Sequence, residues 1–522
     1  MDIDYIIVQA GGKGTRLGKL TKNKPKALCP VENLPILFHL FKKFPDKKFI
    51  IIGDYQYQVL EGYLKSFATV DYSMVRAEGA GTCGGIQKAL QYVPVDRPFM
   101  LIWCDLILGE EFGLDELMQS DYIGISKGFS CRWSYRDGTF SEEPSKDCGV
   151  AGLFLFNKKD KLNNVPSEGE FVKWLKEKNL KFLVLPMEDA REFGSLADFQ
   201  KEDKMEYRSR PFNKLTIDGD LVIKYPISEQ GESLARREEQ WYREIEGYGF
   251  KQVPKIYNFS PLTMEKIDGV TIFKAKLSQE EKKRVLYNLV ASLKKLHDLK
   301  ECPVEIDSVN EAYFEKTMKR LESVKHLIPL ADREYIRIND KLCRNIFYFK
   351  KDFRQQIEDL LYDTRFVLIH GDCTFSNTLI DRELNVTFID PRGYFGHTEL
   401  CGDVYYDWAK VYYSIYGDYD QFNNKNFDLT IKEDWVLLRI ETSGWKDLTD
   451  FYLSQIEKCD IKKIKLIHAI IWLSLSTYVW EDYDSICGAF YNGLYYFNEN
   501  MEKSLHRVLE KTCRSAKNLL GH

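Results

Sequence analysis

The sequence predicts an α/β protein whose two parts differ in architecture, and three observations indicate this. At 522 residues the chain exceeds the size of one ordinary domain. Up to about residue 200, short β-rich runs alternate with helical patterns, which indicates βαβ units and a mostly parallel sheet covered on both faces. Beyond this point the chain changes to a small β lobe and then to a large, mainly helical lobe. We therefore expect domains at residues 1–205 and 206–522, the second divided into lobes at about 206–268 and 269–522.

Composition and charge are typical of a soluble globular protein. Hydrophobic residues make up 44% and charged residues 29%, a balance unlike that of disordered chains. The formal net charge of −5 is too weak to attract nucleic acid or an anionic membrane surface. We therefore expect small-molecule substrates as partners, with no nucleic acid and no membrane, while composition predicts no particular oligomeric state.

A reduced cytoplasmic location is the expectation. The 12 cysteines are spaced singly with no C-x-x-C pair, a pattern that favours neither a zinc site nor a disulfide framework. The first residues, MDIDYIIVQAGG, lack the basic segment and apolar core of a secretory signal. The most apolar later stretch, residues 469–480, is shorter than the roughly 20 residues that a membrane-spanning helix needs.

Six β-rich runs bounded by turn residues predict the strands of the first part. They read YIIVQA, KKFIIIGD, YSMVRA, PFMLIWCD, VAGLFLF and LKFLVLPM. Helical patterns lie between these runs and read LPILFHLFKKF, QVLEGYLKSFA, GGIQKALQYV and EGEFVKWLKEK. Because ligands of such sheets bind beyond the carboxyl ends of the strands, motifs at strand ends are the candidates for function.

A glycine-rich loop follows the first strand and reads Q-A-G-G-K-G-T-R-L, with Lys24-Pro25-Lys26 shortly after it. Glycines let backbone N–H groups close around phosphate oxygens, and the basic side chains that follow add positive charge. The loop does not fit G-x-x-x-x-G-K-[ST], which excludes a P-loop. A simple tight turn is the alternative that this loop alone leaves open. The expected nucleotide-binding residues in the loop are Gly11, Gly12, Gly14 and Thr15.

Three further motifs follow in order along the first part. A second glycine turn spans Gly81–Gly85, Asp105 ends the strand PFMLIWCD, and Glu192 begins the segment E-F-G-S. With the first loop, they resemble the motifs of sugar-phosphate nucleotidyltransferases, and the resemblance covers about residues 3–200. The chain departs from the family at Glu192, where the family segment D-x-G-T has aspartate.

The resemblance implies a Rossmann-like nucleotidyltransferase domain, in which a phosphate oxygen attacks the α-phosphorus of an NTP and pyrophosphate leaves. Because both reactants are anionic, neutralisation of charge and alignment provide most of the catalysis. Arg16 would hold the triphosphate, and Lys26 would hold the attacking phosphate. Asp105 and Glu192 would bind Mg²⁺. The residues expected to approach the base and sugar are Gly81, Thr82 and Gly84.

The residues alone leave structural alternatives open for the two acids. Asp105 could cap the end of a strand, and Glu192 could be an exposed loop acid.

The second part begins with LTI-DGD-LVIKY, in which Asp-Gly favours a hairpin turn between two apolar strands. A charged helix is expected at about Glu232–Gly247, followed by a strand pair that ends near MEKIDG. From Ser278 onward the pattern is mainly helical, apart from one β-rich segment that contains FVLIHGD, NTLID and NVTFID.

A second set of motifs lies on that β-rich segment, which contains I-H-G-D-C-T-F-S-N and then F-I-D-P-R. The spacing from Asp372 to Asn377 equals that of the kinase loop H-R-D-L-x-x-x-N, and Asp390 takes the place of the D-F-G aspartate. Protein kinases have Arg at the position of Gly371 and D-F-G instead of I-D-P. Residues of about 210–420 therefore resemble the aminoglycoside phosphotransferase/choline kinase family.

This second resemblance implies a bilobal α+β kinase-like domain that transfers a phosphoryl group from ATP. Asp372 would take or orient the proton of an acceptor hydroxyl group. Asn377 and Asp390 would hold Mg²⁺ against the ATP phosphates. Lys224 would pair with those phosphates and would itself be oriented by an acid on the following helix, for which we choose Glu238.

Several alternatives stay open in this part. Glu239 could replace Glu238 as the orienting acid, and Lys224 could be an ordinary surface lysine. Asp403 and Asp407 lie four residues apart on one helix face, where they would brace the catalytic loop or recognise the acceptor. Four tyrosines could enclose a quaternary ammonium group or simply pack in the core. These are Tyr412, Tyr413, Tyr416 and Tyr419.

The two resemblances together predict a bifunctional enzyme. The kinase half would phosphorylate a sugar or polyol with ATP. The transferase half would then join the product to a nucleotide from a second NTP, with release of pyrophosphate. Mg²⁺ would serve both sites, and the product would supply a surface polysaccharide. CTP is favoured because such families commonly use it when a kinase supplies a non-anomeric phosphate.

Two alternatives to this function remain. The first is a choline or ethanolamine kinase joined to a phosphocholine-type cytidylyltransferase. The second is a chain with one active domain, in which the other domain is a binding or regulatory module.

Overall fold

The computed structural model describes residues 3–114, 120–202 and 213–500. The chain divides into two units, of which the first combines Met1–Glu206 with the short segment Glu481–Asp484. The rest of the chain forms the second unit. The predicted domain boundary after residue 205 lies outside the described residues.

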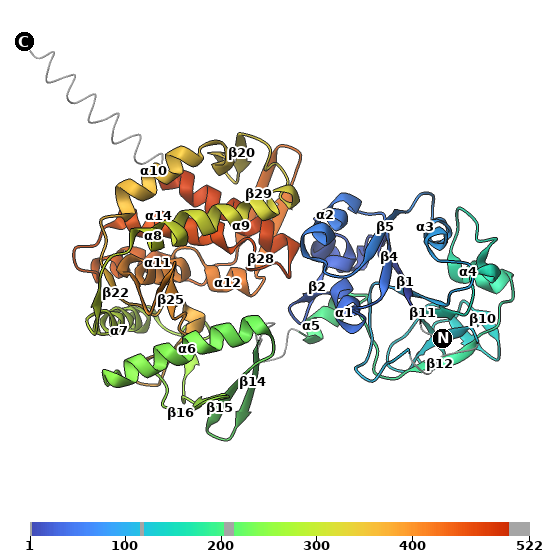
Figure 1. The fold of residues 1–522 in the computed structure, drawn as a ribbon, viewed down its shortest axis with the longest axis horizontal. Coiled ribbons are helices and arrows are strands. Elements are labelled where there is room, and N and C mark those ends of the chain that lie inside the picture. The colour runs from blue at the N-terminus through green and yellow to red at the C-terminus, as the bar shows by residue number, and fades with distance from the viewer. Residues whose placement is uncertain (1–2, 115–119, 203–212, 501–522) are drawn as a thin grey trace, which may run out of the picture. The chain divides into compact units, whose positions relative to one another are not determined.

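A nine-stranded sheet forms the centre of the first unit (Figure 1). Strand β1 (Tyr5–Gln9) lies between β4 (Lys48–Gly53) and β6 (Phe99–Trp103) and is parallel to both. On the far side of β6, β11 (Gly149–Phe156) adds in antiparallel orientation, and all eight of its residues are buried. Four of the six apolar runs thus form largely buried strands of an α/β sheet, as predicted, whereas Tyr72–Arg76 and Leu183–Met187 are more exposed.

The remaining elements of the first unit are short. Its other strands are β2 (Pro30–Val31), β3 (Leu34–Pro35), β5 (Tyr72–Arg76), β7 (Leu106–Ile107), β8 (Tyr122–Ser126), β9 (Ser134–Arg136), β10 (Thr139–Ser141), β12 (Leu183–Met187) and β13 (Arg191–Glu192). Its helices are α1 (Ile36–Lys43), α2 (Tyr57–Phe67), α3 (Cys83–Ala89), α4 (Phe171–Glu177) and α5 (Leu196–Glu202). Each of the four predicted helical patterns contains one of α1 to α4.

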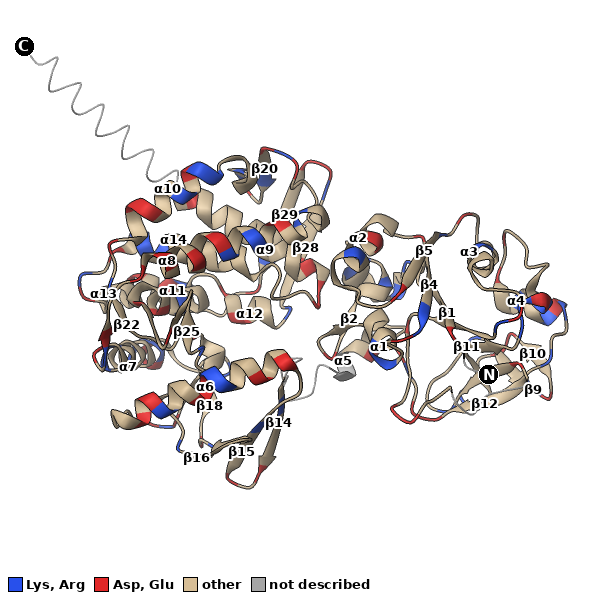
Figure 2. Ribbon diagram, viewed as in Figure 1, with Lys and Arg blue, Asp and Glu red and all other residues tan. Residues whose placement is uncertain are grey.

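The second unit begins with a four-stranded antiparallel sheet in the order β14-β15-β17-β16. These strands are β14 (Asn213–Asp218), β15 (Leu221–Pro226), β16 (Ile256–Phe259) and β17 (Leu262–Glu265). The predicted hairpin forms, but Asp218 pairs with Leu221, so its two-residue turn is Gly219-Asp220, with Gly219 at φ 56°. Helix α6 (Glu229–Gly247) lies beside this sheet and carries side chains of both charges (Figure 2).

Helices dominate the larger lobe of the second unit, where α11 and α14 pack side by side (Figure 1). Its named helices are α7 (Gln279–His297), α8 (Ile306–Asn310), α9 (Lys316–Val324), α10 (Lys350–Leu361), α11 (Val404–Ile415), α12 (Tyr419–Asn423), α13 (Thr449–Ser454) and α14 (Ile461–Leu475). Residues 483–500 are also helical. The Ser278 side chain and Glu281 form a capping box at the start of α7.

Short strands surround the loop that carries Asp372 in this lobe. They are β18 (Val270–Thr271), β19 (Glu301–Cys302), β22 (Phe366–Leu368), β23 (Thr378–Ile380), β24 (Val386–Phe388), β25 (Tyr394–Phe395), β26 (Thr398–Glu399) and β27 (Cys401–Asp403). Strand β22 lies between β19 and β27. Cys302 and Cys401 form a disulfide across this sheet, which the single spacing of the cysteines did not predict.

A further four-stranded sheet was not predicted from the sequence. Its strands are β20 (Tyr335–Ile338), β21 (Lys341–Arg344), β28 (Phe427–Ile431) and β29 (Trp435–Ile440). In β20 the side chains alternate between exposed and buried, which is the pattern of a half-buried strand. The strand has only four residues and lies among helices, so its alternation was too short to stand out.

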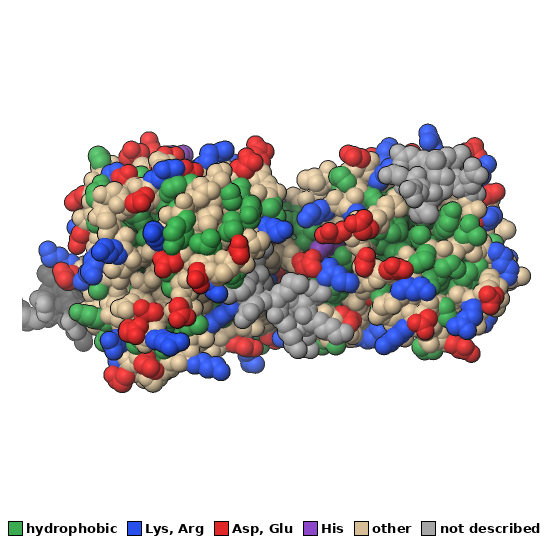
Figure 3. Space-filling model, turned by 90° about the horizontal axis from the view of Figure 1, so that it is seen from below, with side chains coloured by type: hydrophobic (Ala, Val, Ile, Leu, Met, Phe, Trp, Pro, Cys, Tyr) green, Lys and Arg blue, Asp and Glu red, His purple; other side chains and the backbone are tan. Residues whose placement is uncertain are grey.

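None of the helices in the described part of the chain combines the length and apolar character that a membrane crossing requires. On the face drawn in Figure 3, basic and acidic side chains are interspersed over both units.

Candidate functional sites

The glycine loop of the first unit crosses the carboxyl end of β1. A Cβ atom on Gly11 would lie 2.8 Å from Cβ of Asp54, so the loop passes close to the chain that follows β4. Gly14 has φ 61°, a conformation that favours glycine, and it starts a short 3₁₀ helix at Thr15. Around Gly12 there is open space within 4 Å of the Cβ position, where the loop backbone faces outward.

Four predicted residues meet beyond this loop. The Lys26 ammonium group forms an ion pair with the Asp105 carboxylate, and Lys26 is buried. Strand β13 pairs with β7 so that Glu192 lies opposite Leu106, directly after Asp105. Arg16 completes the group, since one of its guanidinium nitrogens and a Glu192 carboxylate oxygen both lie within 3.4 Å of the Cβ position of the intervening Gly194.

The electrostatics of this cluster depend on its burial. Burial and the neighbouring Asp105 carboxylate raise the pKa of Glu192 to about 7, against the opposing charges of Lys26 and Arg16. Burial acts to lower the pKa of Lys26, but the Asp105 carboxylate outweighs it and raises that pKa. The cluster therefore combines two fixed cations with two acids that repel each other.

The second glycine turn packs against a backbone segment of the same unit. Gly81 has φ 92°, and a Cβ atom there would lie 2.3 Å from the carbonyl oxygen of Gly169. The hydroxyl group of Thr82 accepts a hydrogen bond of 2.9 Å from the backbone nitrogen of Phe171, at the start of α4. A Cβ atom on Gly84 would lie 2.3 Å from the carbonyl oxygen of Ser167. Close backbone approach therefore explains both glycines before any ligand is considered.

Lys24 is a residue whose environment the sequence did not reveal. Its buried ammonium group lies 2.8 Å from Asp482 and also pairs with Asp484, and Asn23 donates to Asp484 over 2.9 Å. Burial acts to lower the pKa of Lys24, but the two carboxylates outweigh it and raise that pKa. Both acids belong to the first unit, although they are more than 450 residues from Lys24 in sequence. No local pattern could have predicted the pairing.

In the second unit, Lys224 of β15 takes the position predicted for a phosphate-binding lysine. Its ammonium group lies 2.7 Å from Glu238 of α6 and 2.8 Å from Asp390. Glu238 is buried, whereas Glu239 pairs with Arg243 on the outer side of the same helix. Burial acts to lower the pKa of Lys224, but the two carboxylates raise it, so the lysine stays charged.

The loop after β22 places Asp372 beside Asn377. The Asn377 amide nitrogen donates to the Asp372 side chain over 2.9 Å and to its backbone oxygen over 3.0 Å. The Lys410 ammonium group lies 2.9 Å from the other carboxylate oxygen of Asp372, a contact that the sequence motifs did not indicate. These contacts hold the Asp372 carboxylate in a fixed orientation, as a group that receives a proton must be.

Asp407 braces the catalytic loop from α11. Its carboxylate accepts hydrogen bonds from the backbone nitrogens of His370 (2.9 Å) and Gly371 (2.7 Å) and lies 3.0 Å from the ring of His297. Asp403 is likewise engaged, since it accepts a hydrogen bond of 2.7 Å from the hydroxyl group of Tyr313. Both acids are fully buried, which supports the bracing role over contact with a substrate.

Two pairs of oxygen-bearing side chains fit the coordination chemistry of Mg²⁺. In the first unit they are Asp105 and Glu192, whose mutual repulsion a divalent cation would relieve. In the second unit they are Asn377, whose amide nitrogen is already used by Asp372, and Asp390, whose side chain is 44% exposed. Among the described residues no group of three or more His, Cys, Asp or Glu side chains could hold a metal alone. Nucleotide phosphates and water would complete the coordination, as is usual for Mg²⁺.

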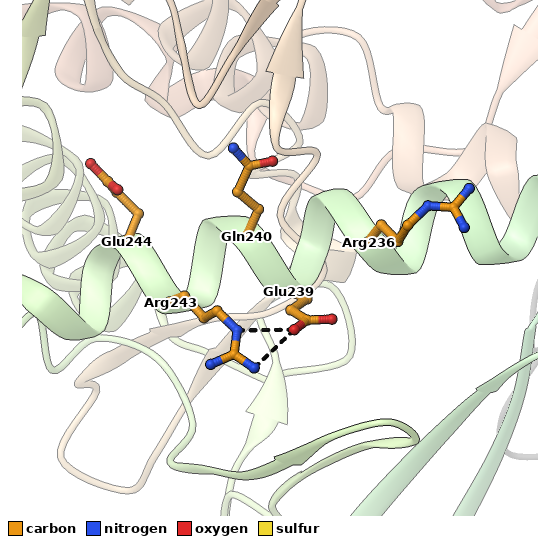
Figure 4. A pocket seen from close by; sticks show the side chains of 5 residues that line it. All are labelled: Arg236, Glu239, Gln240, Arg243 and Glu244. Atoms are coloured by element: carbon orange, nitrogen blue, oxygen red, sulfur yellow. Dashed lines mark hydrogen bonds and ion pairs between the residues drawn. The ribbon is translucent and has the colours of Figure 1, made fainter.

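A surface hollow on the outer face of α6 lies apart from these residues (Figure 4). It is lined by Arg236, Glu239, Gln240, Arg243 and Glu244. All five side chains come from a single helix, and none of the predicted site residues lines the hollow, so we assign it no substrate.

Two family models match separate parts of the chain. Residues 6–120 match the MobA-like NTP transferase domain, and residues 213–432 match the phosphotransferase enzyme family. These matches confirm the resemblance stated for each half.

Individual relatives match parts of the first unit. The bifunctional protein GlmU of Methanocaldococcus jannaschii is 30% identical over 118 residues, which are 22% of this chain and 28% of that protein. The D-glycero-alpha-D-manno-heptose 1-phosphate guanylyltransferase of Campylobacter jejuni is 34% identical over 93 residues, 17% of this chain and 42% of that protein. This chain therefore spans less than half the length of either curated relative.

Among solved structures, the inositol-1-phosphate CTP transferase from T. maritima is 16% identical and has a TM-score of 0.31. The match covers 39% of this chain and 97% of that chain.

Proposed function

We propose that this chain, which joins an N-terminal NTP transferase domain to a C-terminal phosphotransferase domain, catalyses two consecutive reactions. The phosphotransferase half moves the γ-phosphoryl group of ATP to the hydroxyl group of a small acceptor. The transferase half joins that phosphate to the nucleotidyl group of a second NTP and releases pyrophosphate. The observation that carries this proposal is that each half has its own buried cation beside an acid that can bind metal, Lys26 beside Asp105 and Lys224 beside Asp390.

In the phosphotransferase half, Asp372 receives the proton of the acceptor hydroxyl group as its oxygen attacks the γ-phosphorus. Asn377 and Lys410 keep the carboxylate oriented. Lys224, held by Glu238, neutralises charge on the ATP phosphates. Asn377 and Asp390 would hold Mg²⁺, which supplies further neutralisation of the phosphates.

In the transferase half, the acceptor phosphate is the nucleophile, so no proton needs to be removed from carbon or from a hydroxyl group. Lys26 holds this phosphate, and Arg16 binds the triphosphate and the leaving pyrophosphate. The loop of Gly11, Gly12 and Gly14 offers backbone N–H groups to the phosphates. Asp105 and Glu192 would hold Mg²⁺, which neutralises the reacting phosphates.

The acceptor in this proposal is a sugar or polyol, and the product serves as an activated precursor of a surface polysaccharide. The name of the Campylobacter relative, which specifies a heptose 1-phosphate, supports a sugar phosphate as the nucleophile. That name also specifies guanylyl transfer, whereas the sequence resemblance favours CTP. The nucleotide base is therefore the variable that the experiment must determine.

The test supplies full-length protein with ATP, Mg²⁺, one of CTP, UTP or GTP, and a panel of sugars, polyols and amino alcohols. We expect ADP and pyrophosphate to be released together, and only when the correct acceptor is present. If no acceptor gives pyrophosphate with any of these nucleotides, the proposed sequence of reactions is wrong.

A further inference from the structure

Four basic side chains from three separate segments of the second unit lie near one another, and one of them, Lys410, contacts Asp372. Lys316 and Arg320 lie one turn apart on α9, Arg392 follows β24, and Lys410 lies on α11. The backbone nitrogen of Arg392 donates to His370 over 2.8 Å, so Arg392 runs directly beside the catalytic loop.

Aromatic hydroxyl groups hold Arg392, rather than acids. Its guanidinium group donates to the hydroxyl groups of Tyr406 and of Tyr394, the latter over 3.1 Å, and lies 4.5 Å from the ring centre of Tyr394. Arg237 lies against the same Tyr394 ring at 4.2 Å, and Lys410 lies 5.8 Å from the Tyr406 ring. Protein cations therefore already lie against the rings of Tyr394 and Tyr406, where a quaternary ammonium group could otherwise bind.

Most of this positive charge has no direct ion pair, although Glu311 lies near Lys316 and Asp372 lies near Arg392. Arg320 donates to the Ser474 backbone oxygen (2.8 Å) and hydroxyl group (3.0 Å), both of which are neutral. In the described part of the chain, Lys316, Arg320 and Arg392 form no ion pair with a carboxylate, and Lys410 pairs with the catalytic Asp372 alone. The cluster thus carries an excess of positive charge beside the group that receives the proton.

The pKa values of Lys316 and Arg320 agree with this excess. Against the effect of burial, however, Tyr406 raises the pKa of Arg392 and Asp372 raises the pKa of Lys410. Burial and three neighbouring protein cations hold the pKa of Lys316 well below its ordinary value. Burial and the charge of Arg392 lower the pKa of Arg320. The phenol of Tyr394 also has a lowered pKa, for which Arg392 is the largest cause. Like charges held this close destabilise a fold unless a ligand of opposite charge relieves them.

We propose that the acceptor of the phosphotransferase half carries an anionic group, a carboxylate or a phosphate, and that Lys316 and Arg320, with Arg392, bind that group. The proposal rests on the phosphotransferase activity assigned above and narrows its substrate class. An amino alcohol such as choline or ethanolamine is disfavoured, because its positive charge would meet Arg392 and Lys410 beside Asp372. Guanidinium groups suit this task, since they bind carboxylates and phosphates through paired N–H donors.

The cluster could instead stabilise the phosphoryl group in transfer, and the two roles predict different kinetics. A role in transfer would lower kcat for every acceptor alike. Recognition of the acceptor raises KM for anionic acceptors and leaves neutral ones unaffected. Lys316 and Arg320 are the informative positions, because Lys410 contacts Asp372 directly and Arg392 lies against the catalytic loop.

The experiment uses full-length protein and two series of acceptors, each built on one carbon skeleton. The first series is glycerol, glycerate and glycerol 3-phosphate. The second is a hexitol, the corresponding sugar acid and the hexitol phosphate. Glycerate and glycerol 3-phosphate distinguish a carboxylate from a phosphate, and choline and ethanolamine represent cationic acceptors. We expect kcat/KM for ADP release to be roughly tenfold or more higher for an anionic member than for its neutral counterpart. A preference for neutral or cationic members would overturn the proposal.

Variants at the cluster locate the effect. Lys316→Gln and Arg320→Gln are each expected to reduce the preference for anionic acceptors roughly tenfold through KM. Lys319→Gln removes an exposed lysine from the same helix and is expected to leave the preference unchanged. Thermal unfolding should show that all three variants fold. If both cluster variants slow all acceptors equally through kcat, the recognition role is wrong.

A binding titration separates failure of this inference from failure of the proposed function. Each acceptor is titrated into the protein in the presence of a non-hydrolysable ATP analogue. Anionic members that bind through Lys316 and Arg320 but give no ADP would refute the kinase reaction and retain the anion site. Anionic members that bind no more tightly than neutral ones would refute the anion site, whether or not ADP is released.

Discussion

In the second unit, the proposed reaction depends on one carboxylate, that of Asp372. One of its oxygens accepts from Asn377 and the other from Lys410, so the group has a fixed orientation before any substrate binds. In the first unit the corresponding acid is Asp105, which pairs with Lys26 and lies next to Glu192. The two acids therefore give a way to silence each half separately.

Asp372→Asn and Asp105→Asn should each abolish one half-reaction. Asp372→Asn is expected to reduce ADP formation by about 10²–10⁴-fold, because the proton acceptor is lost. It should leave pyrophosphate release intact when the phosphorylated acceptor is supplied directly. Asp105→Asn should do the reverse, and ADP and pyrophosphate are measured in the same samples. A chain in which one half only binds or regulates would show no loss from one of the two substitutions.

His468 makes the stability of the second unit depend on pH. Its ring is fully buried, and its Nε2 atom accepts a hydrogen bond of 3.0 Å from the indole of Trp472, so the imidazole is neutral. Burial lowers its pKa to about 3, whereas in the unfolded chain the ordinary value of about 6.5 applies. Between these values the unfolded state binds the extra proton, so stability falls as the pH falls from 6.5.

The protonation of His468 in the unfolded chain is expected to lower the free energy of unfolding by about 2 kcal/mol when the pH is reduced from 7.5 to 5. His468→Gln removes the titrating group and should flatten that part of the pH dependence, as measured by urea unfolding at both pH values. His397→Gln, at an exposed position, serves as the control and should follow the unchanged protein. If the unchanged protein and His468→Gln lose the same free energy of unfolding between these pH values, His468 does not contribute to the pH dependence.

Single motif residues were predictable to the extent that their chemistry is local in sequence. The loop from Asp372 to Asn377 and the strand-end Asp105 were identified from local motifs and from the family resemblances that these motifs carry. The sequence analysis chose Glu238 but left Glu239 open, because the choice depends on which side of α6 faces β15. Lys410 was missed for a related reason, since only the packing of α11 brings it to Asp372.

At the scale of elements, the glycine turns connect the strands of the first unit to the backbone around them. Gly81 combines a positive φ with a Cβ position 2.3 Å from the Gly169 carbonyl oxygen. At Gly12, by contrast, no atom lies within 4 Å of the position that a Cβ atom would take. The two positions form a matched pair of glycines in the same unit, one confined by packing and one not.

Gly81→Ala should therefore destabilise the first unit by about 3 kcal/mol or more, because both backbone strain and overpacking contribute. Gly12→Ala should change its stability by no more than about 0.5 kcal/mol. Urea unfolding of both variants measures the difference. Equal effects would contradict the close approach of Gly81 to Gly169.

Elements with long or repeated patterns were predicted well, and short elements were not. The apolar runs of β1, β4 and β6, and the hairpin that joins β14 to β15, follow patterns that the fold preserves. The sheet of β20, β21, β28 and β29 pairs strands that are nearly a hundred residues apart, and such pairing leaves little trace in local sequence.

At the scale of the whole molecule, the first unit draws on two distant stretches of the chain. Lys24 is 2% exposed, and its charge is balanced by Asp482 and Asp484. A buried charge that loses its partners is strongly destabilising, whereas removal of the charge along with its partners is much less so.

The double variant Asp482→Asn/Asp484→Asn is expected to destabilise the first unit by about 3–5 kcal/mol. Adding Lys24→Met to that variant should restore part of the loss, although Lys24→Met alone should be harmful because it leaves two acids unpaired. The unfolding free energies of the unchanged protein and of these three variants together form a double-mutant cycle, which measures the coupling between Lys24 and the two acids.

An exposed pair provides the control for that cycle. Glu142→Gln breaks the contact with Arg132 and should cost less than about 1 kcal/mol. Additive effects of Lys24→Met and the double acid variant would contradict the buried network.

The placement of Glu481–Asp484 in the first unit also has a consequence for biosynthesis. A ribosome makes the glycine loop and Lys24 early, and domains near the start of a chain usually fold as they emerge. Here the partners of Lys24 are translated only after almost all of the second unit. Lys24 of the nascent first unit therefore lacks its partner acids until late in translation, and the first unit reaches its full stability only then.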